Sequence, residues 1–94
     1  MPETFRVLTT PAFERDFRKV SKGNPILINA LEELIATLQE DPYNHSGQHK
    51  IKKLVGVKPS EGQWRIRWRE YRLRYDILGK DVVLRSFRHR KEAY

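Results

Sequence analysis

Apolar and polar residues alternate with a period of two along Gln63 to Leu78. The apolar positions form two series: Trp64, Ile66, Trp68 and then Leu73, Tyr75, Ile77. The positions between them are mostly arginine: Arg65, Arg67, Arg69, then Arg72, Arg74 and finally Asp76. Successive side chains of a strand point to opposite faces, so the pattern predicts a strand, a turn and a second strand. One face of this hairpin is apolar and aromatic, and the other is rich in arginine.

A first amphipathic helix is predicted between Thr10 and Gly23. Thr10 followed by Pro11 is typical of an N-cap and a first helical turn. The apolar residues Phe13, Phe17 and Val20 are spaced by four and by three, which places them on one side of a helix. Gly23 suits the left-handed conformation that often ends a helix.

A second helix is predicted from Asn24 and Pro25 to Asp41. Proline disfavours the helical conformation in the residue before it, so Pro42 ends the helix. One side of the helix carries five large apolar residues, whereas the glutamates lie away from it. These five residues are Leu27, Leu31, Leu34, Ile35 and Leu38.

Shorter apolar runs predict three further strands, and glycine marks the loops between them. The strands are expected at Phe5 to Leu8, Lys50 to Val55 and Val82 to Phe87, with a tight turn at Gly79 and Lys80 and a loop over Gly56 to Gly62. The last residues, RHRKEAY, are expected to form a basic tail. This order predicts one α+β domain over residues 1–94, with an N-terminal strand and a two-helix hairpin on one face of a mainly antiparallel sheet of four to five strands.

The positive charge is concentrated in the second half of the chain. Residues 1–49 hold five Lys and Arg against seven Asp and Glu, a net charge of −2, and residues 50–94 hold fourteen against five, a net charge of +9. Such asymmetry indicates an anionic partner, with nucleic acid first and an anionic membrane surface second. The membrane is the weaker alternative because the basic region is patterned as a sheet, and no membrane partner is expected.

Several classes of site are not indicated by the residues. The chain has no cysteine, and His45, His49 and His89 lack the spacing of metal ligands. We find no glycine-rich phosphate loop, carboxylate pair or serine triad, so neither a metal nor a cofactor is expected. No apolar run approaches the ~20 residues that cross a bilayer, and no signal peptide is evident, so we expect a soluble cytoplasmic protein.

The candidate binding residues are the basic side chains of the second half, with tyrosines among them. They are Lys50, Lys52, Lys53, Arg65, Arg67, Arg72, Arg74, Arg85, Arg88, Arg90 and Lys91, with Tyr71, Tyr75 and Tyr94. Basic groups hold phosphates and aromatic rings stack on unpaired bases, an arrangement typical of single-stranded RNA binding. The alternative is a solvated sheet face, but solvated faces usually mix the two signs of charge.

His89 is a candidate for proton transfer. Its unperturbed pKa lies near neutrality, whereas arginine stays protonated and can only stabilise charge. RNA cleavage needs a deprotonated 2′-hydroxyl, a stabilised phosphorane and a protonated leaving group, so a histidine or tyrosine is required beside the arginines. The alternative interpretation of His89 is a surface histidine in a basic tail.

Three segments resemble the RelE/ParE toxin superfamily. WRIRWREYRLRYDI and VVLRSFRHRKEAY are similar to the family's YRIR-like strand, DYRVRYEI-like strand and GHRRDVY-like ending, and IKKLVG at Ile51 to Gly56 is similar to its KKLxG strand. The resemblance implies a toxin of a type II toxin–antitoxin pair. It also implies a cognate antitoxin that covers the basic face.

The resemblance implies two possible targets. In the RelE branch the toxin cuts mRNA in the ribosomal A site and leaves a 2′,3′-cyclic phosphate, with mRNA and the 70S ribosome with its 16S rRNA as partners. In the ParE branch it poisons DNA gyrase. Our first hypothesis is the ribosome-dependent mRNA endonuclease; the alternatives are a gyrase inhibitor and a non-toxic RNA-binding relative.

The resemblance also assigns positions to a catalytic site. Arg65 and Arg67 match the basic pair of the YRIR-like strand, Arg72 the arginine of the next strand, Arg90 the arginine of the HR pair and Tyr94 the closing tyrosine. The family often has lysine at the basic pair, and a lysine with a lowered pKa can act as a base, whereas arginine cannot. This difference moves proton transfer towards His89 or Tyr94. Phe87 and Arg88 replace the usual valine and glycine before the histidine.

Overall fold

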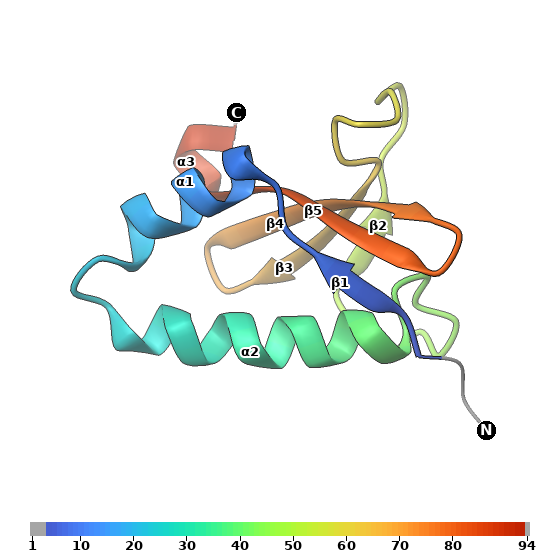
Figure 1. The fold of residues 1–94 in the computed structure, drawn as a ribbon, viewed down its shortest axis with the longest axis horizontal. Helices are drawn as coiled ribbons and strands as arrows, with labels where there is room; N and C mark the ends of the chain where they lie inside the picture. Colours follow the sequence, from blue (N-terminus) through green and yellow to red (C-terminus); the bar gives the residue numbers. More distant parts are fainter. Residues whose placement is uncertain (1–3, 94) are drawn as a thin grey trace.

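The protein is a layered α+β domain in a computed structural model that describes residues 4–93, with side chains over residues 4–91. Its strands are β1 (Arg6–Leu8), β2 (Ile51–Lys53), β3 (Trp64–Trp68), β4 (Tyr71–Leu78) and β5 (Asp81–His89). Its helices are α1 (Pro11–Ser21), α2 (Pro25–Glu40) and α3 (Arg90–Ala93). Figure 1 shows α2 lying across one face of the sheet, and α3 lies beyond the sheet as seen from α2.

The five strands form one mixed sheet in the order β1-β5-β4-β3-β2. β2, β3, β4 and β5 pair antiparallel, whereas β1 pairs parallel to β5. The predicted fold class is confirmed, including the N-terminal strand and the two consecutive helices. The helices α1 and α2 carry the chain from β1 at one edge of the sheet to β2 at the other edge. Three antiparallel pairings then bring the chain back across the sheet, so β5 lies beside β1 and runs in the same direction.

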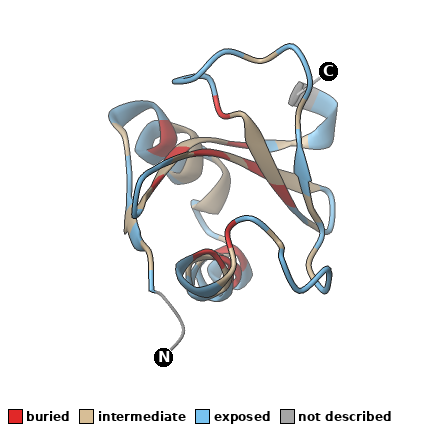
Figure 2. Ribbon diagram, turned by 90° about the vertical axis from the view of Figure 1, so that its right-hand side faces the viewer, coloured by how far each residue is buried: buried red, intermediate tan, exposed pale blue. Residues whose placement is uncertain are grey.

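The core lies between the sheet and α2. Leu27, Ala30, Leu34 and Leu38 of α2 are buried, and Figure 2 shows the buried residues on the side of the helix that faces the sheet. The sheet contributes the predicted apolar series together with residues of β5, and α1 contributes Phe13. Spacing of three and four along α2 aligns its leucines on one side, so the helix buries an apolar stripe there.

Thr10 joins the start of α1 to the edge of β5. Its hydroxyl accepts a hydrogen bond from Phe13 N at 3.1 Å and donates one to Leu84 O at 2.9 Å. The predicted N-cap is therefore confirmed. β1 pairs only with Asp81 to Val83, so α1 rather than a strand covers β5 beyond that point.

Two expectations about the end and the middle of the chain differ from the structure. The prediction of a basic tail over RHRKEAY is wrong for the described residues, because β5 extends to His89 and α3 follows it. The strand at Lys50 to Val55 is shorter, since only Ile51–Lys53 pairs with β3. Leu54 N still donates to Gln63 O at 2.8 Å, and beyond it the chain leaves the sheet edge, where Val55 is 97% exposed.

Candidate functional site

The side of the sheet away from α2 carries a set of basic residues that we call the arginine face. Its members are Lys52, Arg65, Arg67, Arg72, Arg74, Arg85 and Arg88. The strand register explains every member except Arg85, because residues directly opposite each other in antiparallel strands share a face. Arg65 lies opposite Lys52 and Arg74, and Arg72 lies opposite Arg67 and Arg88.

This register places like charges beside one another. Directly opposite residues have Cβ atoms roughly 4.5 to 5.5 Å apart, and like charges in such pairs destabilise a sheet. Arg67 with Arg72, and Arg65 with Arg74, are two such pairs on β3 and β4. An array of this kind is suited to an anion that lies across several guanidinium groups at once, as a phosphate chain does.

A buried carboxylate closes one end of the arginine face. Asp76 accepts hydrogen bonds from Arg85 Nε at 2.8 Å, Gln63 N at 2.8 Å and Gly62 N at 3.2 Å. Burial alone raises the pKa of this carboxyl, but the hydrogen bonds from Gln63, Arg85 and Gly62 together hold its pKa below the usual value. Asp76 thus stays ionised and neutralises Arg85.

A β-bulge explains how Arg85 reaches Asp76. Arg74 lies opposite Ser86 and Tyr75 lies opposite Leu84, so Arg85 is the extra residue of β5. Bulges bend a strand and redirect a side chain. The neighbouring Arg74 donates from Nε to Gly62 O at 3.1 Å, which holds the loop between β2 and β3 on this end of the face.

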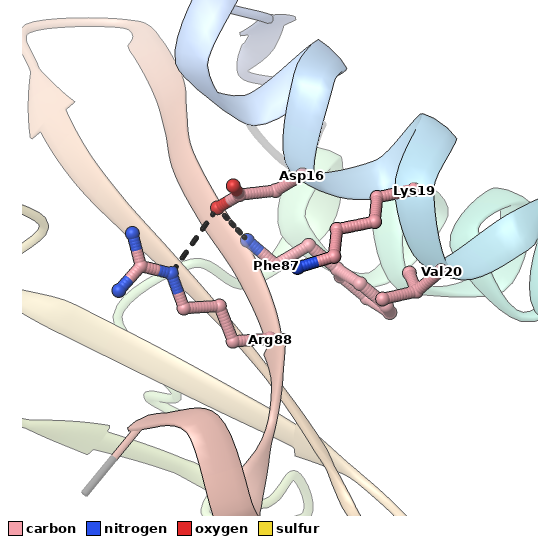
Figure 3. A pocket seen from close by; sticks show the side chains of 5 residues that line it. All are labelled: Asp16, Lys19, Val20, Phe87 and Arg88. Carbon is pink, nitrogen blue, oxygen red and sulfur yellow. Dashed lines mark hydrogen bonds and ion pairs between the residues drawn. The ribbon is translucent and has the colours of Figure 1, made fainter.

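Helix α1 borders the other side of the face at a hollow of about 390 Å³ (Figure 3). Asp16 Oδ2 accepts from Phe87 N at 3.3 Å and from Arg88 Nε at 3.4 Å. Lys19 and Val20 complete the lining. Asp16 therefore satisfies a backbone donor at the β5 edge and offsets the charge of Arg88.

Helix α3 begins at the end of β5 and carries Arg90 and Lys91. Arg90 forms an ion pair with Glu70, with Nε 3.0 Å from Oε2, and its backbone nitrogen donates to Glu70 O at 2.7 Å. Both side chains of this pair are more than half exposed, so a competing anion can reach Arg90. Tyr94 lies outside the described residues, and the structure does not place it.

His89 lies on the side of the sheet that faces α2. It lines a hollow of about 210 Å³ with Leu27 and Trp68, and its ring meets the Tyr71 ring edge to face at 5.2 Å. Its Nδ1 accepts a hydrogen bond from Lys91 N at 3.2 Å. The alternation along β5 places Arg88 on the arginine face and therefore turns His89 away from it.

Two tyrosines and a lysine expected among the basic residues also lie on the α2 side. Tyr75 is fully buried and donates its hydroxyl to Pro42 O at 2.7 Å, and burial raises its pKa well above the usual value. Tyr71 stacks on Phe87. Lys53 lies over the Trp64 ring, and Lys50 is exposed just before β2. The expectation that Tyr71 and Tyr75 stand among the arginines was wrong.

Comparison with known proteins identifies the family. A family model described as "ParE toxin of type II toxin-antitoxin system, parDE" matches residues 7–94. The chain belongs to this family of toxins. The described part of this ParE-family toxin contains no group of three or more His, Asp or Glu side chains placed to hold a metal ion. None of its described helices is both long enough and apolar enough to cross a membrane.

Two solved structures resemble the toxin in fold. One is the toxin–antitoxin complex RelBE2 from Mycobacterium tuberculosis, with 25% identity, a TM-score of 0.70 and coverage of 92% of this chain and 98% of that chain. The other is the RelB-RelE antitoxin–toxin complex from Methanococcus jannaschii, with 23% identity, a TM-score of 0.70 and coverage of 93% and 94%. No curated protein matches the chain.

The carboxylates that shape the arginine face of the toxin were not among the predicted site residues. Asp76 had a visible signal, because it is the one acid in the alternating arginine series of the hairpin. Asp16 had none, since it lies far away in the sequence, on the polar side of α1. Its role depends on the packing of α1 against β5, which the sequence pattern does not specify.

Proposed function

We propose that this toxin cleaves messenger RNA bound in the ribosome. The observation that supports the proposal is the arginine face, where Arg67 and Arg72 lie directly opposite each other on β3 and β4 and Arg65 lies two residues before Arg67 on β3. Arg67 is exposed, and Arg65 and Arg72 are half-buried beside it. Several guanidinium groups on one face match the repeated negative charge of an RNA backbone. The same residues are those that the family resemblance assigns to the scissile phosphate.

The arginines would serve phosphate binding and charge stabilisation. In the proposed reaction the 2′-oxygen attacks the adjacent phosphorus, the bond from phosphorus to the 5′-oxygen breaks, and a 2′,3′-cyclic phosphate remains. Arg65, Arg67 and Arg72 would neutralise the phosphorane, which carries more negative charge than the starting diester. Arg90, whose ion pair with Glu70 is exposed, would join them when RNA displaces the glutamate.

Proton transfer in this proposal is assigned to Tyr94 and not to His89: Tyr94 would accept the 2′-hydroxyl proton and pass it to the departing 5′-oxygen. Arginine cannot accept the 2′-hydroxyl proton, because its pKa exceeds 12. His89 lines the hollow on the α2 side, so its ring is separated from the arginines by the sheet itself. Tyr94 is the closing tyrosine that the family resemblance assigns to this site, and it lies outside the described residues.

A cognate antitoxin is proposed to hold the toxin inactive. Both structural relatives were solved as complexes of a toxin with its antitoxin. We infer that an acidic segment of the antitoxin covers the arginine face of this toxin, because opposite charge lowers the repulsion among the guanidinium groups.

Inhibition of DNA gyrase is the second candidate function. Two observations favour it: the family is described by its ParE members, and none of the three histidines, all within the described residues, lies on the arginine face. A toxin that only binds its target needs no acid or base. In that case the basic face would contact gyrase or its DNA, and no RNA product would form.

The experiment compares the two targets directly. Wild-type toxin is added to a translation extract, mRNA ends are mapped, and gyrase supercoiling is assayed in parallel. The nuclease predicts cuts at codon positions and a loss of roughly 10²- to 10³-fold in cleavage rate for Arg67→Ala. Arg18→Ala, an exposed arginine on α1, is the matched control and should cleave like wild type.

Other results would reject the nuclease. Inhibited supercoiling with intact mRNA selects the gyrase inhibitor. Salt-sensitive RNA binding without any cleavage or gyrase effect selects a non-toxic RNA-binding relative. Cleavage by Arg67→Ala at the wild-type rate removes the arginine face from the reaction.

A further inference from the structure

Four aromatic rings gather at the C-terminal end of α2, and we call this cluster the aromatic platform. It consists of Phe5, Tyr43, His45 and Trp64. The Tyr43 and His45 rings stack with centroids 5.3 Å apart and an angle of 8° between planes. The Tyr43 ring also meets Trp64 edge to face at 5.4 Å and Phe5 at 6.1 Å. Tyr43 is thus fixed between neighbours on three sides.

The loop that carries the platform is held by its own hydrogen bonds. The Asp41 carboxylate accepts from Ser46 Oγ at 2.7 Å, His45 N at 2.8 Å and Ser46 N at 3.2 Å. The hydrogen bond from the Ser46 hydroxyl is the main reason that the pKa of Asp41 lies below its usual value. The side chain of Asn44 forms two hydrogen bonds with the backbone of His49. Asn44 Oδ1 accepts from His49 N, and Asn44 Nδ2 donates to His49 O. A site ordered in advance loses little entropy when a ligand binds.

The exposed part of the platform borders a hollow of about 260 Å³. The hollow is lined by Phe5, Pro42, Tyr43 and His45 and by the acidic residues Glu40 and Asp41. Tyr43 is 38% exposed and His45 is also exposed. The volume lies below the range of about 300 to 1,000 Å³ for drug-sized ligands, so it suits a single planar ring system.

Lysines flank the rings on two sides. Lys53 Nζ lies 5.6 Å from the centre of the Trp64 ring, and Lys80 Nζ lies 5.5 Å from the centre of the Phe5 ring. Aromatic rings between lysines are the composition of surfaces that bind single-stranded nucleic acid, where bases stack and cations hold the backbone. The carboxylates of Glu40 and Asp41 in the lining repel phosphates, so the hollow suits the base, and the backbone is expected to follow the lysines.

Edge strand β2 connects the platform to the arginine face. Lys52 lies opposite Arg65 and Lys53 lies opposite Trp64, so adjacent residues of one short strand point to the two surfaces. β2 has no partner strand on its outer side in the described sheet. An extended chain that crosses this edge would therefore meet positive charge on both sides of the sheet.

We propose that the aromatic platform stacks an unpaired base of single-stranded RNA, at a second contact outside the arginine face. This inference rests on the proposed RNA target, but it assigns no catalytic role to the platform. Tyr43 and His45 bind the base, whereas Lys53 and Lys80 hold the adjoining backbone.

The test measures the affinity of free toxin for a labelled oligouridylate by fluorescence anisotropy. Loss of one stacking contact is worth about 1 to 3 kcal/mol, so Tyr43→Ala and His45→Ala should each weaken binding at least fivefold. Tyr43→Phe and His45→Phe keep a flat ring and should bind within twofold of wild type. Gln48→Ala is the matched control, since this exposed side chain lies in the same loop outside the platform.

The outcomes separate this inference from the proposed function. Unchanged RNA affinity in folded His45→Ala, or no binding by the wild type, overturns the platform even if mRNA is cleaved. If the alanine variants bind the antitoxin more weakly but keep their RNA affinity, the proposal is also overturned, because the platform is then a binding surface for a protein. If no mRNA is cleaved but the alanine variants still lose RNA affinity, the platform stands and the nuclease fails. Thermal unfolding of each variant verifies its fold.

Discussion

Arg85 donates from Nε to Asp76 Oδ2 at 2.8 Å, and the Asp76 side chain is only 2% exposed. The same carboxylate also accepts hydrogen bonds from the backbone nitrogens of Gly62 and Gln63. The pair therefore joins β4, β5 and the loop between β2 and β3. The arginine face thus has two parts. At one end Arg85 is paired with a carboxylate, and next to this pair the arginines of β3 and β4 lie opposite one another.

Asp76→Ala should destabilise the toxin strongly. Removing one partner of a buried pair leaves the other charge uncompensated, and the backbone donors of the loop lose their acceptor. We expect the free energy of unfolding to fall by about 3 kcal/mol in urea denaturation. Asp81→Ala removes an exposed pair with Arg6 and is the control, for which a much smaller loss is expected. Equal losses of unfolding free energy in the two variants would show that the burial of Asp76 does not determine its contribution to stability.

The same carboxylate predicts a loss of stability in acid. The pKa of Asp76 is lower in the folded than in the unfolded state, so its contribution is complete above the unfolded value of about 3.9. It is lost as pH falls through the folded pKa. Asp41 and Asp81 also have lowered pKa values and act with the same sign. Denaturation curves should show that wild type weakens below about pH 4 and that Asp76→Asn weakens less over this range.

Gly62→Ala tests how closely the loop approaches the arginine face. Gly62 has a φ of +84°, and a Cβ there would lie 2.7 Å from the Cβ of Arg74. Gly47 also has a positive φ, of +71°, but has open space around the same position. The left-handed conformation alone costs a non-glycine residue about 1 to 2 kcal/mol, so Gly47→Ala should lose about that much stability. Gly62→Ala should lose clearly more in the same denaturation assay, and equal losses would contradict the close contact.

Thr10→Ala should weaken the junction between α1 and β5. The hydroxyl caps the helix and also satisfies the carbonyl of Leu84, so its removal should cost about 1 to 2 kcal/mol of stability. Thr10→Ser keeps the hydroxyl and should retain most of the wild-type stability. Thr9→Ala removes an exposed hydrogen bond to Glu14 and serves as the control. The prediction fails if the Thr9 and Thr10 alanine variants unfold at the same urea concentration.

The sequence was sufficient for the fold because each local signal agreed with the architecture. Alternation along the hairpin, leucine spacing along α2 and the Thr10 cap depend only on neighbouring residues. The short helix α3 was missed because four residues carry no periodicity. The parallel pairing of β1 with β5 was missed because it joins segments at opposite ends of the chain.

The site was predictable only in part. Alternation placed Arg65, Arg67, Arg72 and Arg74 on one face, and applied to β5 it also turns His89 to the other side. His89 was expected in a basic tail, to which alternation does not apply, whereas it is the last residue of β5. The partners of Arg85 and Arg88 depend on a bulge and on the packing of α1, and neither has a sequence signature in a single chain.

Arg67 offers a direct test of the arginine face in RNA binding. Each phosphate neutralised by a protein cation steepens the dependence of affinity on salt by about 0.7 in a log–log plot for single strands. Arg67→Ala should flatten this slope by about that amount, whereas Arg67→Lys keeps the charge and should keep the slope. Anisotropy titrations of an oligouridylate at several salt concentrations measure it, with Arg18→Ala as the control. An unchanged slope in Arg67→Ala would mean that RNA does not cross the centre of this face, because Arg67 lies opposite Arg72 in the middle of the array.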